Sequence, residues 1–367
     1  MGAAVTPTAV SGRLATGPSI TRAGAVLGVG ALLLMAAVVV ALAAGSVGVS
    51  LADTLGILGR RLLGLPLAET WQATDETIIF QLRLPRVLTA MLVGGGLAMS
   101  GAVFQAVLRN PLADPYIIGT AAGASLGAVL GIVAPLLLPA LALGIGSSWL
   151  GLGMVQVLAF AGGLGTVLLV YAVARTGGRV PVVTLLLTGY AVSAVLAAAV
   201  ALLMFLSGNA LAAVFSWLMG SLADASWAEL AFAAPLLAIS FGLLLVRWRR
   251  LNLMLLGDAQ AATLGVDVER EKLRLTMLAT LGTSAAVAIS GTIGFVGLVV
   301  PHLLRLAIGP DHRLLLPASL LFGAALLTLA DLGARLVGGV PVGIITALIG
   351  APFFVYLLRR SRMMVPA

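Results

Sequence analysis

Long uncharged stretches constrain this chain more than any other feature. Eight runs carry no Asp, Glu, Lys or Arg, and the longest has 60 residues: 23–52, 87–108, 115–174, 180–223, 230–246, 275–304, 314–330 and 336–358. A helix needs about 20 apolar residues to cross the hydrocarbon core of a bilayer. Only 9% of the residues are charged and 61% are hydrophobic, whereas soluble domains contain about 25% charged residues. The pattern predicts an all-α polytopic membrane protein in the lipid bilayer.

Composition also excludes several kinds of function. The net charge of +8 would suggest nucleic-acid binding in a soluble protein. Here most cations lie in short segments between apolar runs, where they set membrane topology, so no nucleic-acid partner is expected. The chain has no cysteine and two histidines, which rules out thiolate chemistry and argues against a dedicated metal site.

The number of spans depends on one ambiguous run. Residues 23–52 exceed the roughly 7 to 15 residues of a signal-peptide core, so they are assigned to the first span. The 115–174 run holds two spans, with a break near Pro135 to Ser148. The 180–223 run holds one span and a short extra helix around "AVFSWLMGS". Residues 275–304 either cross once or turn at "SGTIGFVG" and return, which gives nine or ten spans.

Charge favours ten spans with a cytoplasmic N-terminus. In that arrangement 16 of the 21 Lys and Arg residues lie on the cytoplasmic side, whereas nine spans would place the basic C-terminal tail outside, against the positive-inside rule. The predicted organisation is a cytoplasmic tail over 1–22, one ten-span domain over 23–360 with a cytoplasmic loop over 247–274, and a cytoplasmic tail over 361–367. Five arginines remain outside: Arg60, Arg61, Arg83, Arg86 and Arg335.

Missing motifs narrow the mechanism further. Ion-coupled carriers keep ionisable residues inside the membrane, but here only Asp331 approaches that depth. Because it precedes Arg335 by four residues, an ion pair on one helix face is expected. The sequence has no phosphate-binding "GxxxxGK[ST]" and no catalytic constellation. A transporter energised by a partner is therefore favoured over a secondary carrier with broken helices, and a membrane enzyme is disfavoured.

Small residues recur at every fourth position within 94–106: Gly94, Ala98, Ala102 and Ala106. Such a stripe lets helix backbones approach closely in a membrane. Packing within one chain is the favoured interpretation, and a subunit interface is the alternative.

Several motifs resemble the FecCD-type permeases of type II ABC importers. They are "RLPRVLTAMLVGGGLAMSGAVFQAVLRNPLADPYIIGTAAGASLGA", "GDAQAATLGV", "GTIGFVGLVVPHLLRLAIGPDHRLLLPASLLFGA" and "PVGIITALIGAPFF", within about residues 80–360. The resemblance implies ten spans and a homodimer with the substrate pathway at its interface. It also implies two ATP-binding subunits, which carry ATP and Mg, and a periplasmic binding protein. The chain would then be a multi-pass subunit of a bacterial inner membrane that imports cobalamin, haem or a ferric siderophore.

The resemblance assigns a role to three of the outside arginines. In the family, arginines of the "RLPR" motif and one between the last two spans dock the binding protein through its glutamates. The matching residues are Arg83, Arg86 and Arg335. The chain departs from the family at Gly339, where a glutamate usually precedes the "PVG" motif.

The resemblance also predicts a cytoplasmic gate. Its first half matches Asn110 and Leu112, and alignment through "LLLTG" places its second half at Val182 and Val183. The cobalamin member has small hydroxyl residues at the second pair, so this chain is expected to close with an apolar constriction that excludes water. The alternative is that the valines only begin a helix after Pro181.

The 247–274 loop resembles the family's coupling segment, whose short helices sit in a groove of the ATPase. The residues assigned to this contact are Gly257, Asp258, Ala261, Leu264 and Gly265. The two glycines punctuate the segment as helix boundaries do.

Overall fold

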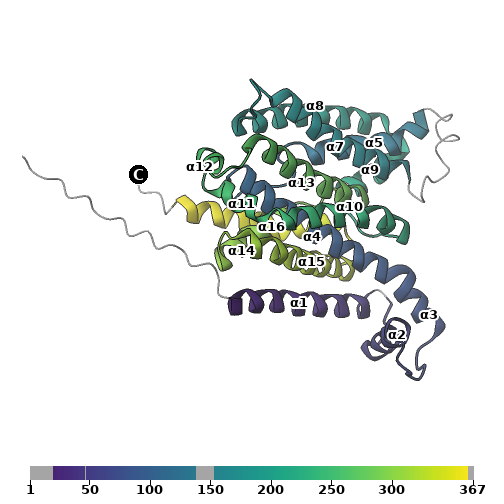
Figure 1. The fold of residues 1–367 in the computed structure, drawn as a ribbon. Helices are drawn as coiled ribbons and strands as arrows, with labels where there is room; N and C mark the ends of the chain where they lie inside the picture. The colour runs from purple at the N-terminus through teal and green to yellow at the C-terminus, as the bar shows by residue number, and fades with distance from the viewer. Residues whose placement is uncertain (1–19, 46, 138–152, 363–367) are drawn as a thin grey trace, which may run out of the picture.

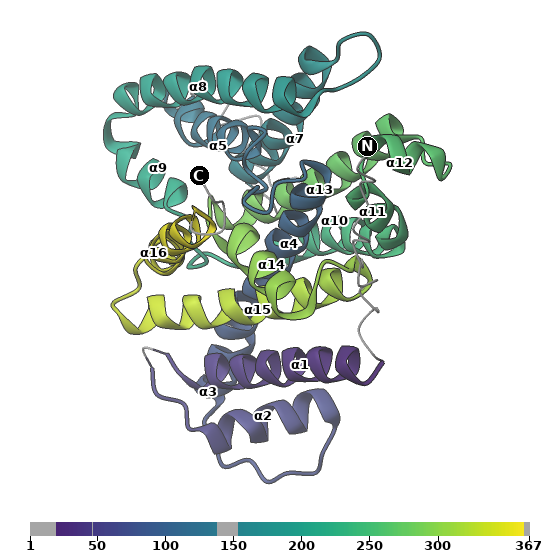
Figure 2. The same ribbon diagram turned by 90° about the vertical axis from the view of Figure 1, so that its left-hand side faces the viewer.

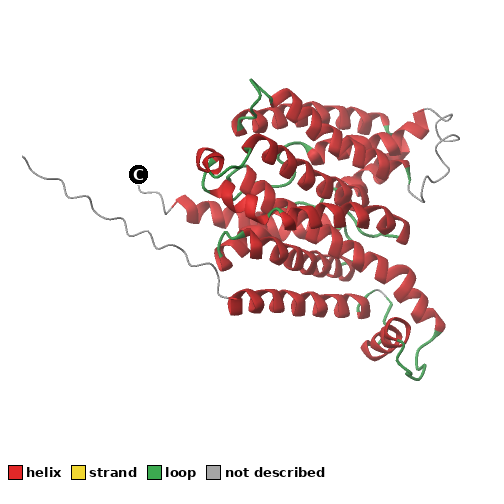
Figure 3. Ribbon diagram, viewed as in Figure 1, coloured by secondary structure: helices red, strands yellow, loops and turns green. Residues whose placement is uncertain are grey.

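The computed structural model describes residues 20–45, 47–137 and 153–362, and over these ranges the chain is helical apart from loops and one isolated bridge between Thr176 and Arg179 (Figure 3). The expected break between Pro135 and Ser148 lies largely outside the described residues. So do most of the predicted N-terminal tail and the last residues of the C-terminal tail.

Over the described residues, the bundle is formed by ten helices: α1(Ile20–Ala43), α4(Leu84–Val107), α5(Thr120–Leu137), α7(Met154–Ala174), α8(Val182–Leu206), α10(Trp227–Val246), α13(Val268–Ser290), α14(Val296–Ile308), α15(His312–Leu336) and α16(Val342–Arg362). Seven of them are long and apolar enough to cross a membrane, and α5, α14 and α16 contribute shorter apolar segments. Shorter helices connect them: α2(Leu51–Leu63), α3(Ala73–Thr77), η1(Ile78–Arg83), η2(Gly208–Ala210), α9(Leu211–Leu218), α11(Trp248–Leu255) and α12(Asp258–Thr263).

The two ends of the bundle are distinguished by the short segments that they carry (Figure 1). One end carries α2 and α3, which lead through η1 into the "RLPR" segment at the start of α4, and it is called the RLPR end. The other carries α11 and α12, and it is called the α12 end. Helix α1 begins, and α16 finishes, at the α12 end. The first and last described helices thus begin and finish on one side of the bundle, as an even number of crossings requires.

The ambiguous run folds as two helices, the arrangement that the ten-span prediction requires. Helix α13 ends at Ser290, the chain turns at residues 291–295, and α14 returns toward the α12 end. Gly291 and Phe295 both have positive φ, of 66° and 69°. With 13 residues at 1.5 Å each, α14 is about 20 Å long. Since the hydrocarbon core is about 30 Å thick, the turn lies within the depth of the membrane.

Protein groups satisfy the polar backbone of this turn. The Thr292 hydroxyl donates to the Leu218 carbonyl at 2.5 Å. The Tyr116 hydroxyl donates to the Ile293 carbonyl at 3.1 Å and accepts from its N–H at 3.2 Å. Irregular backbone at membrane depth is tolerated only where protein or a cavity surrounds it, so α9 and the loop after α4 make the turn possible.

Helix α4 is the centre of the bundle. It contacts α10, α13, α14 and α15, and 83% of its apolar window is buried. A Cβ on Gly94 would overlap the Gly323 carbonyl of α15, and a Cβ on Gly101 would overlap the Gly297 carbonyl of α14. Ala98, Ala102 and Ala106 are also buried. The small-residue stripe therefore packs within one chain, as the favoured interpretation predicted.

Helices α1 and α8 lie on opposite sides of the bundle (Figure 2). Only 22% of the apolar window of α1 and 11% of that of α8 are buried. On α8 the exposed apolar side chains include Val183, Leu187 and Tyr190, which share one helix face because they are four and three residues apart. Both helices offer apolar surfaces to lipid or to another protein.

Gly101→Ala is expected to destabilise the chain by about 1–3 kcal/mol, the usual cost of overpacking a tight interior. The new methyl group would meet the Gly297 backbone, which cannot rotate away. Thermal unfolding of the detergent-purified protein measures the effect. Gly165→Ala in α7 is the control, because a Cβ there meets nothing within 4 Å. Equal melting temperatures for both variants would contradict the close approach of α4 and α14.

Candidate functional site

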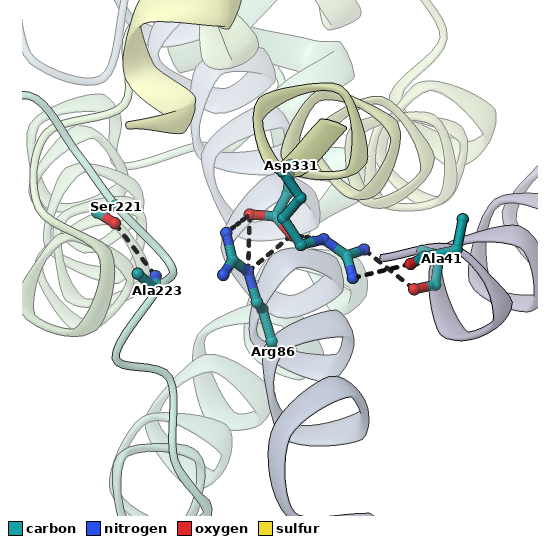
Figure 4. A network of polar contacts seen from close by, with 7 residues as sticks. Ala41, Arg86, Ser221, Ala223 and Asp331 are labelled. Carbon is teal, nitrogen blue, oxygen red and sulfur yellow. Dashed lines mark hydrogen bonds and ion pairs between the residues drawn. The ribbon is translucent and has the colours of Figure 1, made fainter. Parts of the chain in front are cut away.

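At the RLPR end, Asp331 of α15 joins two of the predicted docking arginines (Figure 4). The Arg86 guanidinium donates to both carboxylate oxygens, from Nε at 3.0 Å and from Nη2 at 2.8 Å. Arg335 pairs with the same carboxylate at 3.2 Å, so the expected i,i+4 ion pair is confirmed. Asp331 is 1% exposed, and a buried carboxylate of this kind needs such partners.

The third arginine, Arg83, binds the last turn of α1. Its guanidinium donates to the carbonyls of Leu42 at 2.7 Å and Ala43 at 2.8 Å, and to that of Val47. Arg335 donates to the Ala41 carbonyl of the same turn at 3.0 Å. The final carbonyls of a helix have no partners within it and attract cations. The arginines thus attach the end of α1 to α4 and α15.

These contacts leave the three arginines little exposed. Arg83 is 5% exposed, and the side chains of Arg86 and Arg335 are 17% and 10% exposed. Together they line an open recess of about 260 Å³, closed on one side by the loop at Ala223 and Ala225. The structure brings all three predicted docking residues to one site. Sequence analysis missed the contacts of Arg83 and Arg335 with the end of α1, which join residues 40 to 294 positions apart.

The predicted gate residues lie at the α12 end, at the ends of α4 and α8. The Asn110 carboxamide accepts the Leu112 N–H at 3.0 Å and so shapes the loop that follows α4. In the same loop, burial raises the pKa of Asp114 to about 6, although its hydrogen bond from the Tyr116 N–H opposes the shift. Leu112 is half-buried. Within the described chain, the side-chain hydrogen bond of Asn110 stays in its own loop.

The two valines occupy the first turn of α8. Pro181 precedes them as the N-cap residue. Val182 packs partly against the main core, while Val183 is 67% exposed. In a single chain Val183 is therefore free to contact lipid or another protein.

A charged cluster connects α12 to both predicted halves of the gate. Asp258, at the start of α12, pairs with Arg109, which immediately precedes Asn110. Arg109 has a φ of 47°, which is rare for a residue with a side chain. Asp258 also accepts from the Lys272 ammonium of α13 at 2.6 Å.

The second branch of the cluster reaches α8. Lys272, whose side chain is 8% exposed, lies 3.7 Å from Glu269. The Glu269 carboxylate accepts the Val180 N–H at 2.9 Å. Val180 and Pro181 lead directly into Val182. The cluster therefore links α12 to the segments that carry both pairs of predicted gate residues.

The residues assigned to ATPase contact differ in orientation. Gly257 precedes α12 with a φ of 114°, and Gly265 follows it with a φ of 82°, as expected for helix boundaries. Leu264 is 56% exposed. Ala261 is fully buried, in a cluster with Val266, Val268 and Leu253. Ala261 is thus a packing residue of α12, and the exposed positions available to a partner include Ala262 and Leu264.

Among the described residues no group of three His, Cys, Asp or Glu side chains is placed to hold a metal ion.

The departure from the family at Gly339 has a structural correlate. Gly338 and Gly339 have φ values of 100° and 77°, and a glutamate would be strained at either position.

Asp331→Asn is expected to destabilise the chain by about 3–5 kcal/mol, because it leaves two largely buried arginines without their shared countercharge. Glu69→Gln removes an exposed partner of Arg60 and should cost less than about 1 kcal/mol. Thermal unfolding in detergent compares the two variants. Equal stability of Asp331→Asn and the wild type would mean that the network does not hold α1, α4 and α15 together.

Known proteins resemble this chain over nearly its whole length. The sequence matches the FecCD transport family over residues 33–360. It is 44% identical over 287 residues to the cobalamin import system permease protein of Halobacterium salinarum, covering 78% of this chain and 74% of that protein. It is 40% identical over 316 residues to the hemin transport system permease protein of Yersinia pestis, covering 84% and 92%.

The fold is similar to a solved inward-facing structure of a metal-chelate type ABC transporter. The match has a TM-score of 0.77 and 34% identity, and it covers 92% of this chain and 99% of that chain. These comparisons confirm the resemblance seen in the sequence motifs. They also imply that nucleotide binding belongs to a partner subunit, because the family is the membrane-spanning part of ABC importers. The chain belongs to the FecCD transport family of ABC importer permeases.

Proposed function

We propose that this chain forms the transmembrane pathway of an ATP-driven importer for an iron chelate, haem or cobalamin. The observation that carries the proposal is the joint match of sequence and fold to permeases of this kind. A periplasmic binding protein would deliver the cargo, and a partner ATPase with bound ATP and Mg would supply the energy. Cargo identity would depend mainly on the binding protein, because a fold does not specify a ligand.

The proposed assembly is a homodimer in the bacterial inner membrane, with both termini in the cytoplasm. The face of α8 that carries Val183, Leu187 and Tyr190 would meet its copy and line the pathway. Its exposure in one chain supports this proposal, because an obligate interface is apolar. The α12 end would face the cytoplasm, which agrees with the arginines of 247–250 near α12. The proposed organisation is a cytoplasmic tail over 1–22, a membrane domain over 23–360 and a cytoplasmic tail over 361–367, although α1 begins at Ile20 and α16 runs to Arg362.

The arginine recess is the proposed docking site for the binding protein. Asp331 pairs with Arg86 and Arg335, and among the described residues no carboxylate lies within ion-pair distance of Arg83, so the recess keeps positive charge. Glutamates on the receptor would complement it and increase the association rate more than the affinity. The arginine site would then both dock the receptor and join α1 to the bundle.

The coupling proposal assigns Gly257, Asp258, Leu264 and Gly265 to the segment that the ATPase moves, with Ala261 packing behind them. The Asp258 cluster would transmit that movement to Asn110 and Leu112 on one side and to Val182 and Val183 on the other. Valines from two subunits would form a constriction that resists wetting.

Cysteine cross-linking tests the dimer. The native chain has no cysteine, so single cysteines at Val183, Leu187 and Tyr190 give an unambiguous background. In membranes, oxidation is expected to join two chains through at least one of these positions. Leu32→Cys and Met35→Cys on α1, which are 73% and 64% exposed, should stay monomeric. Cross-linking through α1 alone would move the interface to the opposite side of the bundle.

Asp258→Asn tests the coupling cluster. The variant loses both ion pairs of Asp258, so proteoliposomes that contain the permease, its ATPase and the loaded binding protein should hydrolyse ATP but import cargo at least about tenfold more slowly. A tenfold change corresponds to about 1.4 kcal/mol, a plausible value for two partly exposed charge pairs. Asp267→Asn is the control, because Asp267 pairs with the exposed Arg270 outside the cluster. Unchanged import by Asp258→Asn would contradict this route of coupling.

A further inference from the structure

A polar cavity lies near the RLPR end, between α7, α9, α10 and α13. Its volume is about 240 Å³, and its polar lining comes from Gln156, Ser216, Ser221, Asp224, Glu229 and Ser290. The loop at Ala225 separates it from the arginine recess and lines both. The proposed transport mechanism makes no use of this cavity.

Glu229 carries the buried charge of the cavity. It lies in the first turn of α10 and is 8% exposed. One carboxylate oxygen accepts the Gln156 carboxamide N–H at 2.8 Å. The other carboxylate oxygen and the Gln156 carboxamide oxygen are buried without a hydrogen-bond partner. Two unpaired acceptor oxygens from different helices therefore belong to residues that line the same cavity.

The described lining of the cavity offers Glu229 no positive countercharge. Among the described residues that line the cavity there is no lysine, arginine or histidine, and Asp224 adds a second carboxylate at its exposed side. The segment at 138–152, which joins α5 to α7 in sequence and is not described, contains no cationic residue either. Water would satisfy the hydrogen bonds but would leave the buried charge uncompensated, which is costly.

The helix ends around the cavity favour a cation. Residues 288–291, at the C-terminal end of α13, line it, as do Ser216 and Trp217 in the last turn of α9. Helix C-termini carry partial negative charge. Half-helix C-termini and exposed carbonyls coordinate sodium in other membrane proteins. Glu229 lies in the first turn of α10, and the partial positive charge of a helix N-terminus favours the ionised form of its carboxylate.

We propose that this cavity binds a small monovalent cation of the sodium class, with Glu229 and Gln156 as oxygen ligands and Asp224 at the mouth. A divalent ion is not favoured. Calcium takes six to eight oxygen ligands that usually include several carboxylates, whereas only two carboxylates line the cavity. A bound cation would join α7 to α10 and to the loop that carries Asp224.

Sodium itself is the probe. The full chain, purified in detergent, is heated in NaCl, KCl, LiCl or choline chloride at equal ionic strength. The melting temperature is expected to be several degrees higher in NaCl than in choline chloride, because a ligand that binds only the folded state stabilises it. Glu229→Gln should abolish the difference and melt at or above the wild type in choline chloride, since a neutral amide needs no countercharge. Equilibrium binding of ²²Na⁺ should be lost in the same variant.

Matched variants make the result specific. Glu76→Gln removes a carboxylate that pairs with exposed Arg61, and it should keep the full sodium effect. Gln156→Met removes a ligand oxygen but leaves the carboxylate, and it should weaken ²²Na⁺ binding at least about tenfold. Equal wild-type melting in all four salts, without ²²Na⁺ binding, would overturn the proposal and indicate a protonated Glu229. A sodium effect that survives in Glu229→Gln would also overturn it, because the ion would then bind elsewhere.

Discussion

Close contact between helix backbones around α4 is the interaction on which the rest of the fold depends. In a membrane, apolar side chains gain little by leaving lipid, so helices associate through van der Waals packing and hydrogen bonds. Gly94 and Gly101 allow α15 and α14 to lie against α4 with no side chain between them. That contact fixes the short helix α14 and, through it, the buried turn at 291–295. The backbone of residues 291–295 requires the polar partners that α9 and Tyr116 provide.

Charged groups complete this framework at the two ends of the bundle. At the RLPR end, Asp331 holds Arg86 and Arg335, while Arg83 binds the carbonyls at the end of α1. At the α12 end, Asp258 links α12 to α4 and α13. Each cluster joins helices that are far apart in sequence, and each lies where a partner protein is proposed to bind. Close packing in the middle of the bundle therefore holds the helices together, while the charged clusters at its ends join helices at the proposed partner sites.

The distribution of charged residues and the lengths of the uncharged runs predicted much of the helical arrangement from sequence alone. The positive-inside rule favoured ten spans, because an arrangement with nine spans would place the basic C-terminal tail outside. The i,i+4 spacing predicted the Asp331–Arg335 ion pair. Both signals are local in the chain. The bond from Arg83 to Leu42 and the bond from Gln156 to Glu229 join distant residues, so no spacing rule finds them. The burial of Ala261 depends on packing against Val266 and Val268. The sequence of a six-residue helix is too short to show which face is buried.

The source of energy is the most direct test of the transport proposal. The permease is reconstituted in liposomes with its ATPase and its binding protein, and uptake of labelled cobalamin, haem and a ferric siderophore is followed. Uptake of one cargo is expected to require ATP and the loaded binding protein, and to continue when ionophores collapse proton and sodium gradients. Uptake by the permease alone, driven by an ion gradient and abolished by ionophores, would contradict an ATP-driven importer and support a secondary carrier.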